Sequence, residues 1–123
     1  MRAQREHEDR PWGCFDVIDD DAPDHKVKRI VVHPGRRLSY QRHAKRSEHW
    51  FVVSGTATVM LDGVVTEVRG GESIDIPVQS AHRIANEGDC DVVLIEVQRG
   101  SYFGEDDIVR LEDDYGRSTG GLG

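Results

Sequence analysis

Residues 35–55 read GRRLSYQRHAKRSEHWFVVSG, with the spacing Gly-(x)5-Gln-x-His-(x)4-Glu-(x)6-Gly. Gln41 and His43 are two residues apart, so on an extended strand both side chains point to the same face. Glu48 follows after a short connection, at the start of an apolar run. This segment therefore presents three potential metal ligands at strand-like spacing.

A second segment, residues 71–86, adds a fourth candidate ligand. It reads GESIDIPVQSAHRIAN and holds the isolated His82, 27 residues beyond Gly55. Taken singly, each candidate is more readily explained as an ordinary strand or loop residue. Together they supply two imidazoles, a carboxylate and an amide oxygen, which suit Zn, Mn, Fe, Co or Ni and not soft thiolate chemistry. The whole spacing favours a metal site made of Gln41, His43, Glu48 and His82.

The composition indicates one acidic domain. The chain has 123 residues, with 16 Lys and Arg against 23 Asp and Glu, and a formal net charge of −7. This balance argues against nucleic acid as a partner. Cys14 and Cys90 lie far apart, which indicates reduced thiols in a cytoplasmic protein. No apolar window is long enough to span a membrane, and the acidic runs at 19–21, 105–107 and 112–114 are expected to be solvated faces.

Short strands with period-2 alternation dominate, separated by turn residues. Asp62-Gly63, between two apolar runs, predicts a two-residue hairpin of the primed type. Such a succession is typical of an all-β sandwich or barrel. One helical turn is expected at 104–110, and residues 1–9 and 118–123 are expected to be flexible ends. The expected strands are 12–18, 26–33, 38–43, 48–54, 56–61, 64–68, 73–76, 82–86 and 92–98.

The phasing of the 48–54 strand separates its two faces. Even-numbered residues from Glu48 to Val52 share one side, and odd-numbered residues from His49 to Val53 share the other. Both faces are largely apolar, so the strand is expected to be buried inside a barrel and against another sheet or subunit. His49 is therefore assigned to packing or to a dimer contact. A homodimer is expected, in which residues 12–17 add to the partner's sheet.

The two segments resemble the paired motifs of the cupin superfamily, Gly-(x)5-His-x-His-(x)3,4-Glu-(x)6-Gly and Gly-(x)5-Pro-x-Gly-(x)2-His-(x)3-Asn. Gln41 stands where the first His is usual, and Gln79 stands where the Gly of the second motif is usual. The resemblance implies a single all-β domain over residues 10–117. Its fold would be the cupin-type double-stranded β-helix, a jelly-roll barrel.

Gln41, together with four further segments, makes the resemblance specific to one branch of the superfamily. RPWG (10–13), KVKRIVVHPG (26–35), SEHWFVVSGTA (47–57) and GEDDIVRLEDDYGR (104–117) look like the C-terminal cupin domain of type II phosphomannose isomerases. In bifunctional members that domain follows a mannose-1-phosphate guanylyltransferase domain. The resemblance implies metal-dependent interconversion of mannose 6-phosphate and fructose 6-phosphate, with one divalent ion, Zn before Mn, Co, Ni or Fe. Ala44-Lys45 replaces the family's run of His, which bears on substrate identity.

The implied reaction moves a proton between neighbouring carbons through an enediol, and positive charge near the developing oxyanion would assist it. Arg46 is the candidate catalytic cation, because it lies two residues before Glu48; a solvated loop position is the other interpretation. Lys28 is the candidate ligand for the substrate's phosphate, unless it lies on an outer strand face. Glu96 faces either the cavity, as a possible base, or solvent.

Two functional classes remain open. One is an isomerase acting on a small sugar phosphate, and the other is a non-catalytic metal-binding cupin module that binds a sugar or sugar phosphate. Cations placed where they could bind the phosphate of a sugar held at the metal would favour the isomerase. A metal-dependent dioxygenase, a third class, would more usually have His in place of Gln41. Neither nucleic acid nor membrane is an expected partner.

Overall fold

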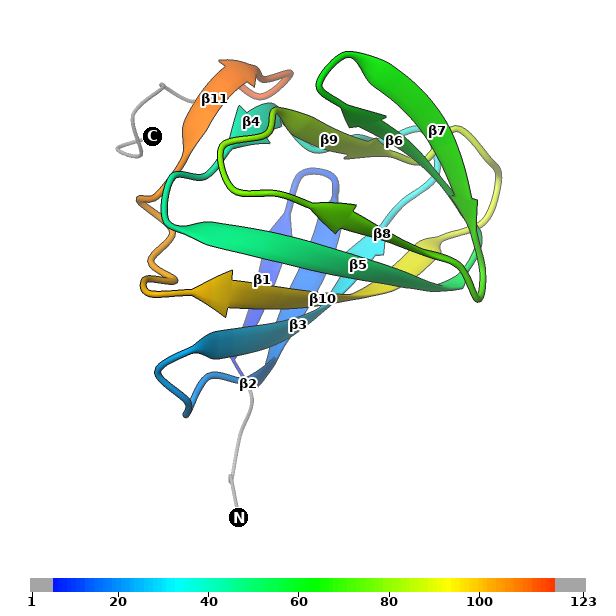
Figure 1. The fold of residues 1–123 in the computed structure, drawn as a ribbon. Helices are drawn as coiled ribbons and strands as arrows, with labels where there is room; N and C mark the ends of the chain where they lie inside the picture. The colour runs from blue at the N-terminus through cyan, green and yellow to red at the C-terminus, as the bar shows by residue number, and fades with distance from the viewer. Residues whose placement is uncertain (1–5, 117–123) are drawn as a thin grey trace.

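Two antiparallel sheets face each other across a barrel (Figure 1). The structure is a computed structural model that describes residues 6–116, and no helix occurs among them. One sheet has the strand order β1-β2-β3-β10-β5-β8, and the other has the order β11-β4-β9-β6-β7. The strands are β1 (His7–Arg10), β2 (Gly13–Asp19), β3 (His25–Val32), β4 (Tyr40–Arg42), β5 (Arg46–Ser54), β6 (Thr56–Leu61), β7 (Val64–Arg69), β8 (Ser73–Ile76), β9 (His82–Ala85), β10 (Val92–Gly100) and β11 (Val109–Glu112).

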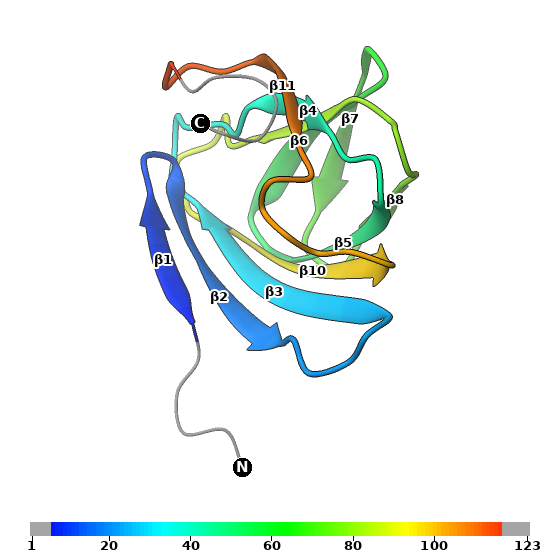
Figure 2. The same ribbon diagram turned by 90° about the vertical axis from the view of Figure 1, so that its left-hand side faces the viewer.

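The predicted all-β jelly-roll architecture is confirmed, and every predicted strand is present with ends that agree to within two residues. The strands β1 and β11 were not predicted, because HEDR has no apolar residue and the alternation in VRLE spans only four residues. Both lie at sheet edges (Figure 2). The helical turn expected at 104–110 is wrong. That segment has one hydrogen-bonded turn, in which Asp107 N donates to Gly104 O at 3.1 Å, and then enters β11.

Cross-strand register sorts the barrel interior into a polar end and an apolar end. On β10, Gln98 pairs with Glu48, and Leu94 pairs with Val52, on neighbouring β5. On the other side of β10, Glu96 pairs with Lys28 of β3. Side chains alternate between the two faces of a strand. The inward residues of β3, β10 and β5 are therefore charged or polar at one end of the barrel and aliphatic at the other. Buried apolar side chains fill the apolar end and reach the floor of the polar end: Phe15, Ile30, Val32, Val52, Val59, Ile84, Val92 and Leu94.

The predicted phasing of β5 is confirmed. Glu48, Trp50 and Val52 are buried inside the barrel, whereas Phe51 is 42% exposed and Val53 is 49% exposed. Within the described chain, nothing covers the outer face at these two positions. The strand β2 pairs with β1 on one edge and with β3 on the other, so both of its edges are used within the molecule. The expectation that residues 12–17 add to a partner's sheet is therefore wrong.

Two predicted motif residues have structural roles. Asp62 and Gly63 both have positive φ, 48° and 82°, which confirms a primed hairpin turn between β6 and β7. Asn86 is buried, and its Nδ2 donates to Val32 O at 2.8 Å and to Cys90 O at 2.7 Å. Its Oδ1 accepts from Gly88 N at 3.0 Å. The Asn that ends the second motif therefore joins the end of β3 to the loop between β9 and β10.

Residues 1–5 and 117–123 lie outside the described residues. The predicted domain limits at residues 10 and 117 stay predictions, and residues 7–9 form part of β1. Cys14 and Cys90 are both free. Within residues 6–116, no helix has the length and hydropathy needed to cross a bilayer.

The departure at Gln79 makes a stability prediction. Gln79 has φ of 70°, a left-handed conformation that is unfavourable for a side chain with a Cβ. We expect Gln79→Gly to raise the free energy of unfolding by about 0.5–1 kcal/mol in urea denaturation, because relief of this strain outweighs the added chain entropy. Ser80→Gly is the control, and it should lower stability. Equal losses in both variants would contradict the argument.

Candidate functional site

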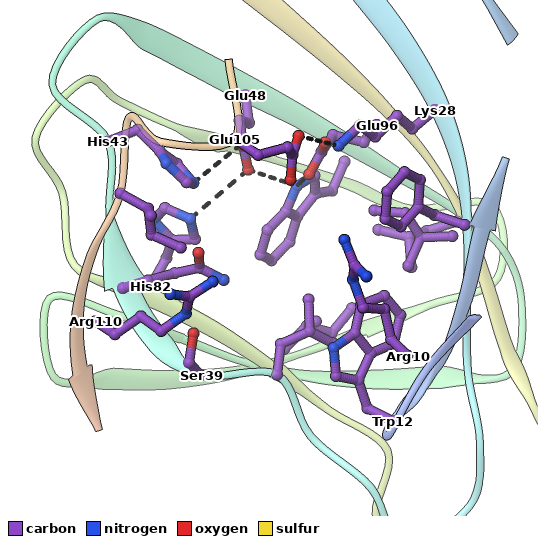
Figure 3. Close-up of a pocket in the computed structure, with 18 of the residues that line it drawn as sticks. Arg10, Trp12, Lys28, Ser39, His43, Glu48, His82, Glu96, Glu105 and Arg110 are labelled. Atoms are coloured by element: carbon purple, nitrogen blue, oxygen red, sulfur yellow. Dashed lines mark hydrogen bonds and ion pairs between the residues drawn. The ribbon is translucent and has the colours of Figure 1, made fainter. Parts of the chain in front are cut away.

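A cavity of about 400 Å³ lies at the polar end of the barrel (Figure 3). Its walls come from both sheets and from the segment between β10 and β11. Polar and charged residues line it beside aromatic ones. They include Arg10, Lys28, Ser39, Gln41, His43, Arg46, Glu48, His82, Glu96, Glu105 and Arg110.

His43, Glu48 and His82 form a buried group whose ligand atoms all lie within 4.8 Å of one another. The Nε2 atom of His43 lies 3.3 Å from Glu48 Oε2, and the Nε2 atom of His82 lies 3.6 Å from Glu48 Oε1. Gln41 lines the same cavity and pairs with His82 across β4 and β9. The four predicted ligands thus line one cavity, and three of them present their donor atoms to a common point.

The hydrogen bonds of the two imidazoles leave one nitrogen of each directed at that point. The Nδ1 of His43 donates to Asp107 O at 2.6 Å, and the Nδ1 of His82 donates to Ser80 O at 2.9 Å. The Nε2 of His82 is buried and has no hydrogen-bond partner in the described part of the chain. Burial, with the nearby Arg46 and His82, lowers the pKa of His43 to about 4. A neutral His43 with a fixed tautomer, next to a second imidazole and a carboxylate, fits a divalent metal ion.

Arg46 is a buried cation directly beside this group. Its Nε and Nη2 atoms each lie 2.9 Å from Glu48 Oε2, and Nη2 lies 3.2 Å from His43 Nε2. Burial alone would raise the pKa of Glu48, but the neighbouring His82 and Arg46 reverse the effect and lower it. The solvated-loop interpretation of Arg46 is therefore wrong.

Glu96 faces the cavity and not the solvent, the two positions that the sequence left open for it. Trp50 Nε1 donates to Glu96 Oε2 at 3.0 Å and to Glu48 Oε1 at 3.1 Å, so the indole bridges the two carboxylates. Gln98 Nε2 donates to Glu96 Oε1 at 2.6 Å. Burial and the negative charge of Glu48 raise the pKa of Glu96. The pKa of Glu48 is lowered and the pKa of Glu96 is raised, so the two carboxyl groups of this site lose their protons at different pH.

Lys28 also faces inward and is only 4% exposed, so its placement on an outer face is wrong. Its Nζ donates to Glu105 Oε2 at 2.8 Å and lies 4.2 Å from the centroid of the Phe15 ring. Arg10 lies over the same ring, with Cζ at 5.3 Å, and its Nη2 is 2.6 Å from Glu8 Oε1. Figure 3 shows the Arg10 side chain extending into the cavity.

The segment between β10 and β11 contains site residues that the sequence argument missed. Glu105 bonds Lys28, and the carboxylate of Asp107 accepts from the backbone amides of Ala44 and Lys45, each at 2.9 Å. The run at 105–107 was expected to be a solvated face; Glu105 is half exposed, but its carboxylate and that of Asp107 also bond groups of the barrel. The only sequence signal was their membership of GEDDIVR, a segment quoted for the family resemblance.

The departure at Ala44-Lys45 does not reach the cavity. Both residues are exposed and neither lines it. Lys45 Nζ instead lies 4.9 Å from the centroid of the Tyr102 ring. His49 lies on the outer face of β5, with Nδ1 2.6 Å from Asp75 Oδ1. The opposite placement of His49 and Glu48 agrees with the predicted phasing.

Comparison with solved structures supports the fold. The capsular polysaccharide assembling protein CapF from Staphylococcus aureus aligns with a TM-score of 0.77 and 26% identity, over 90% of this chain and 33% of that one. The cupin domain of Schizosaccharomyces pombe Cnp3 aligns with a TM-score of 0.68 and 13% identity, over 71% of this chain and 64% of that one. At 13% identity the second likeness concerns the fold alone.

Comparison of sequences is more specific. The chain is 52% identical over 110 residues to the alginate biosynthesis protein AlgA of Pseudomonas aeruginosa, which covers 89% of this chain and 23% of that protein. It is 51% identical over 108 residues to the mannose-1-phosphate guanylyltransferase ManC of Salmonella typhimurium, covering 88% and 22%. The chain therefore spans less than a quarter of the length of these curated relatives.

The family model described as mannose-6-phosphate isomerase C-terminal matches residues 2–113, which include every strand and every cavity residue named above. With this match, and with the double-stranded β-helix of the structure, the chain belongs to the mannose-6-phosphate isomerase C-terminal family, on a cupin fold.

Proposed function

We propose that this domain interconverts mannose 6-phosphate and fructose 6-phosphate with the help of one divalent metal ion. Zn is the first candidate for that ion, and Mn, Co, Ni and Fe are the others. Family membership supplies the substrate class. The carrying observation is a cavity that combines the buried, unpartnered Nε2 of His82, among the described residues, with two buried cations. A module that only binds a sugar phosphate would need the metal and the phosphate contact, but not a cation beside the reacting carbons.

In this proposal Gln41, His43, Glu48 and His82 hold the metal. The ion would polarise the sugar's carbonyl and hydroxyl oxygens when bound. Arg46 lies against Glu48, so its guanidinium is placed to bind the sugar oxygen that gains negative charge as the proton leaves carbon. Lys28 binds the phosphate. Trp50 holds the carboxyl groups of Glu48 and Glu96 at fixed positions, which orients both toward the cavity.

The chain offers a matched pair of variants for the metal site. His82→Ala removes a proposed ligand, whereas His49→Ala removes a histidine on the opposite face of the barrel wall. We expect Zn, Mn or Co to raise the melting temperature of the wild type and of His49→Ala. His82→Ala should bind the metal at least about 100-fold more weakly, since even residues that only orient a ligand contribute 10–100-fold. Equal metal affinity in the wild type and in both variants would contradict the proposed metal site.

Arg46 is tested by separating turnover from metal content. In a coupled assay with mannose 6-phosphate, Arg46→Ala should lower turnover by about 10²–10³, the usual effect of losing one group that stabilises an oxyanion. Metal content should stay unchanged, whereas Glu48→Ala should lose both. Arg69→Ala, at an exposed pair with Glu67, is the control.

Full turnover in Arg46→Ala would eliminate the catalytic role. A folded, metal-loaded wild type with no isomerase activity on mannose 6-phosphate would favour the non-catalytic module instead. Circular dichroism of each variant shows whether the fold is kept, because Arg46 is buried against Glu48.

We also propose a homodimer formed through the outer face of the six-stranded sheet, in the cytoplasm. The exposed Phe51 and Val53 support the dimer, and the free thiols of Cys14 and Cys90 support the location. Light scattering at micromolar concentration should give twice the monomer mass for the wild type. Phe51→Glu should give the monomer mass, because it places a charge in the proposed contact. A monomeric wild type would contradict the dimer.

A further inference from the structure

Lys28 and its partner Glu105 differ in how firmly they are held. Lys28 is on β3, between β2 and β10, and is nearly fully buried. The side chain of Glu105 is 53% exposed and belongs to the segment between β10 and β11. A buried ammonium needs a compensating anion, since burial of an unpaired charge is costly. The cation is therefore a fixed part of the barrel, and its partner is within reach of solvent.

The cations around Glu105 favour its ionised form, although Lys28 also faces Glu96 and Arg10 bonds Glu8. Arg10 lies over the same Phe15 ring as Lys28, and Arg46 lies further along the cavity wall. Burial alone would raise the pKa of Glu105, but Lys28 and Arg46 reverse the effect and lower it. Glu105 is thus an anion held among cations. A phosphate monoester carries a larger negative charge than a carboxylate and offers three acceptor oxygens, so it can compete for the same donors.

We propose that Glu105 is a resident anion, which occupies Lys28 until the phosphate group of a ligand displaces it. The inference rests on the proposed function in taking a sugar phosphate as the ligand of this cavity. Its consequence is specificity. A neutral sugar cannot replace a carboxylate on a buried ammonium, so Glu105 closes the cation to unphosphorylated sugars.

The segment that carries Glu105 has anchors that do not depend on Lys28. Asp107 accepts from the amides of Ala44 and Lys45, and its carbonyl accepts from His43. These contacts keep the segment attached to the barrel when the Glu105 carboxylate leaves. Glu105 is therefore not required as the bond that closes the segment over the cavity.

The test is calorimetric titration of inorganic phosphate into the full chain after chelation of metal. Glu105→Gln removes the competing charge, and Glu67→Gln makes the same change at an exposed pair with Arg69. We expect Glu105→Gln to bind phosphate about tenfold more tightly than the wild type, because a hydrogen bond to a charged group contributes roughly that much. Glu67→Gln should match the wild type. Lys28→Met/Glu105→Gln should lose the gain.

The inference is overturned if Glu105→Gln binds phosphate no more tightly than the wild type, or if neither protein binds it. It is equally overturned if the double variant keeps the gain. Should the double variant fail to fold, the comparison of Glu105→Gln with Glu67→Gln decides alone. None of these measurements needs turnover, so a chain inactive on mannose 6-phosphate that gains phosphate affinity in Glu105→Gln would refute the isomerase proposal and not this one.

Discussion

The alternation of side chains across β3, β10 and β5 governs everything at the polar end of the barrel. Lys28, Glu96 and Trp50 stand opposite one another on these three strands, and Gln98 stands opposite Glu48 two residues away. A slip of one residue in either pairing would turn a whole set of side chains to the outer surface. The aliphatic residues two positions further along each strand fix that register by burial. The apolar end therefore determines where the charged groups of the other end lie.

Concentrating charge inside a small barrel has a cost that the groups offset only in part. Glu48, Arg46 and His43 contact one another, Trp50 bridges to Glu96, and Gln98 bonds Glu96 in turn. Yet His82 Nε2, Arg46 Nη1 and Gln98 Oε1 are buried with no hydrogen-bond partner within residues 6–116. Unsatisfied buried polar atoms are uncommon in proteins, and they tend to coincide with sites that bind something. Two of these residues, His82 and Arg46, line one cavity side by side with the candidate metal ligands, which indicates a place built for a ligand.

The part of this arrangement that could be predicted from the sequence is the part carried by regular strands. Period-2 phasing places Glu48 inside and His49 outside, and the structure agrees because β5 has apolar neighbours on its inner face that hold it in register. The same reasoning left Lys28, Arg46 and Glu96 open, since a charged residue in an alternating strand does not itself show whether its face is buried or exposed. Glu105 and Asp107 were out of reach. An acidic run resembles a solvated surface until the cation and the amides that it meets, some sixty or more residues away in sequence, are known.

The residues that line the cavity come from two kinds of strand, inner strands and edge strands, and this difference bears on the chemistry of the site. The candidate metal ligands come from β4, β5 and β9 or directly beside them, strands inside the sheets. Arg10 comes from the edge strand β1, Arg110 from the edge strand β11, and Glu105 from the segment before it. Edge strands and their connections can change without disturbing the register that holds the core, because they pair on one side only. The proposed metal ligands and the residues proposed to select the sugar phosphate thus lie on parts of the chain with different freedom to vary. The Ala44-Lys45 departure lies in neither part, since its side chains are outside the cavity and only its amides are used. On this division, a change of sugar specificity is expected to arise through residues such as Arg10 and Glu105, while the histidine and carboxylate group stays as it is.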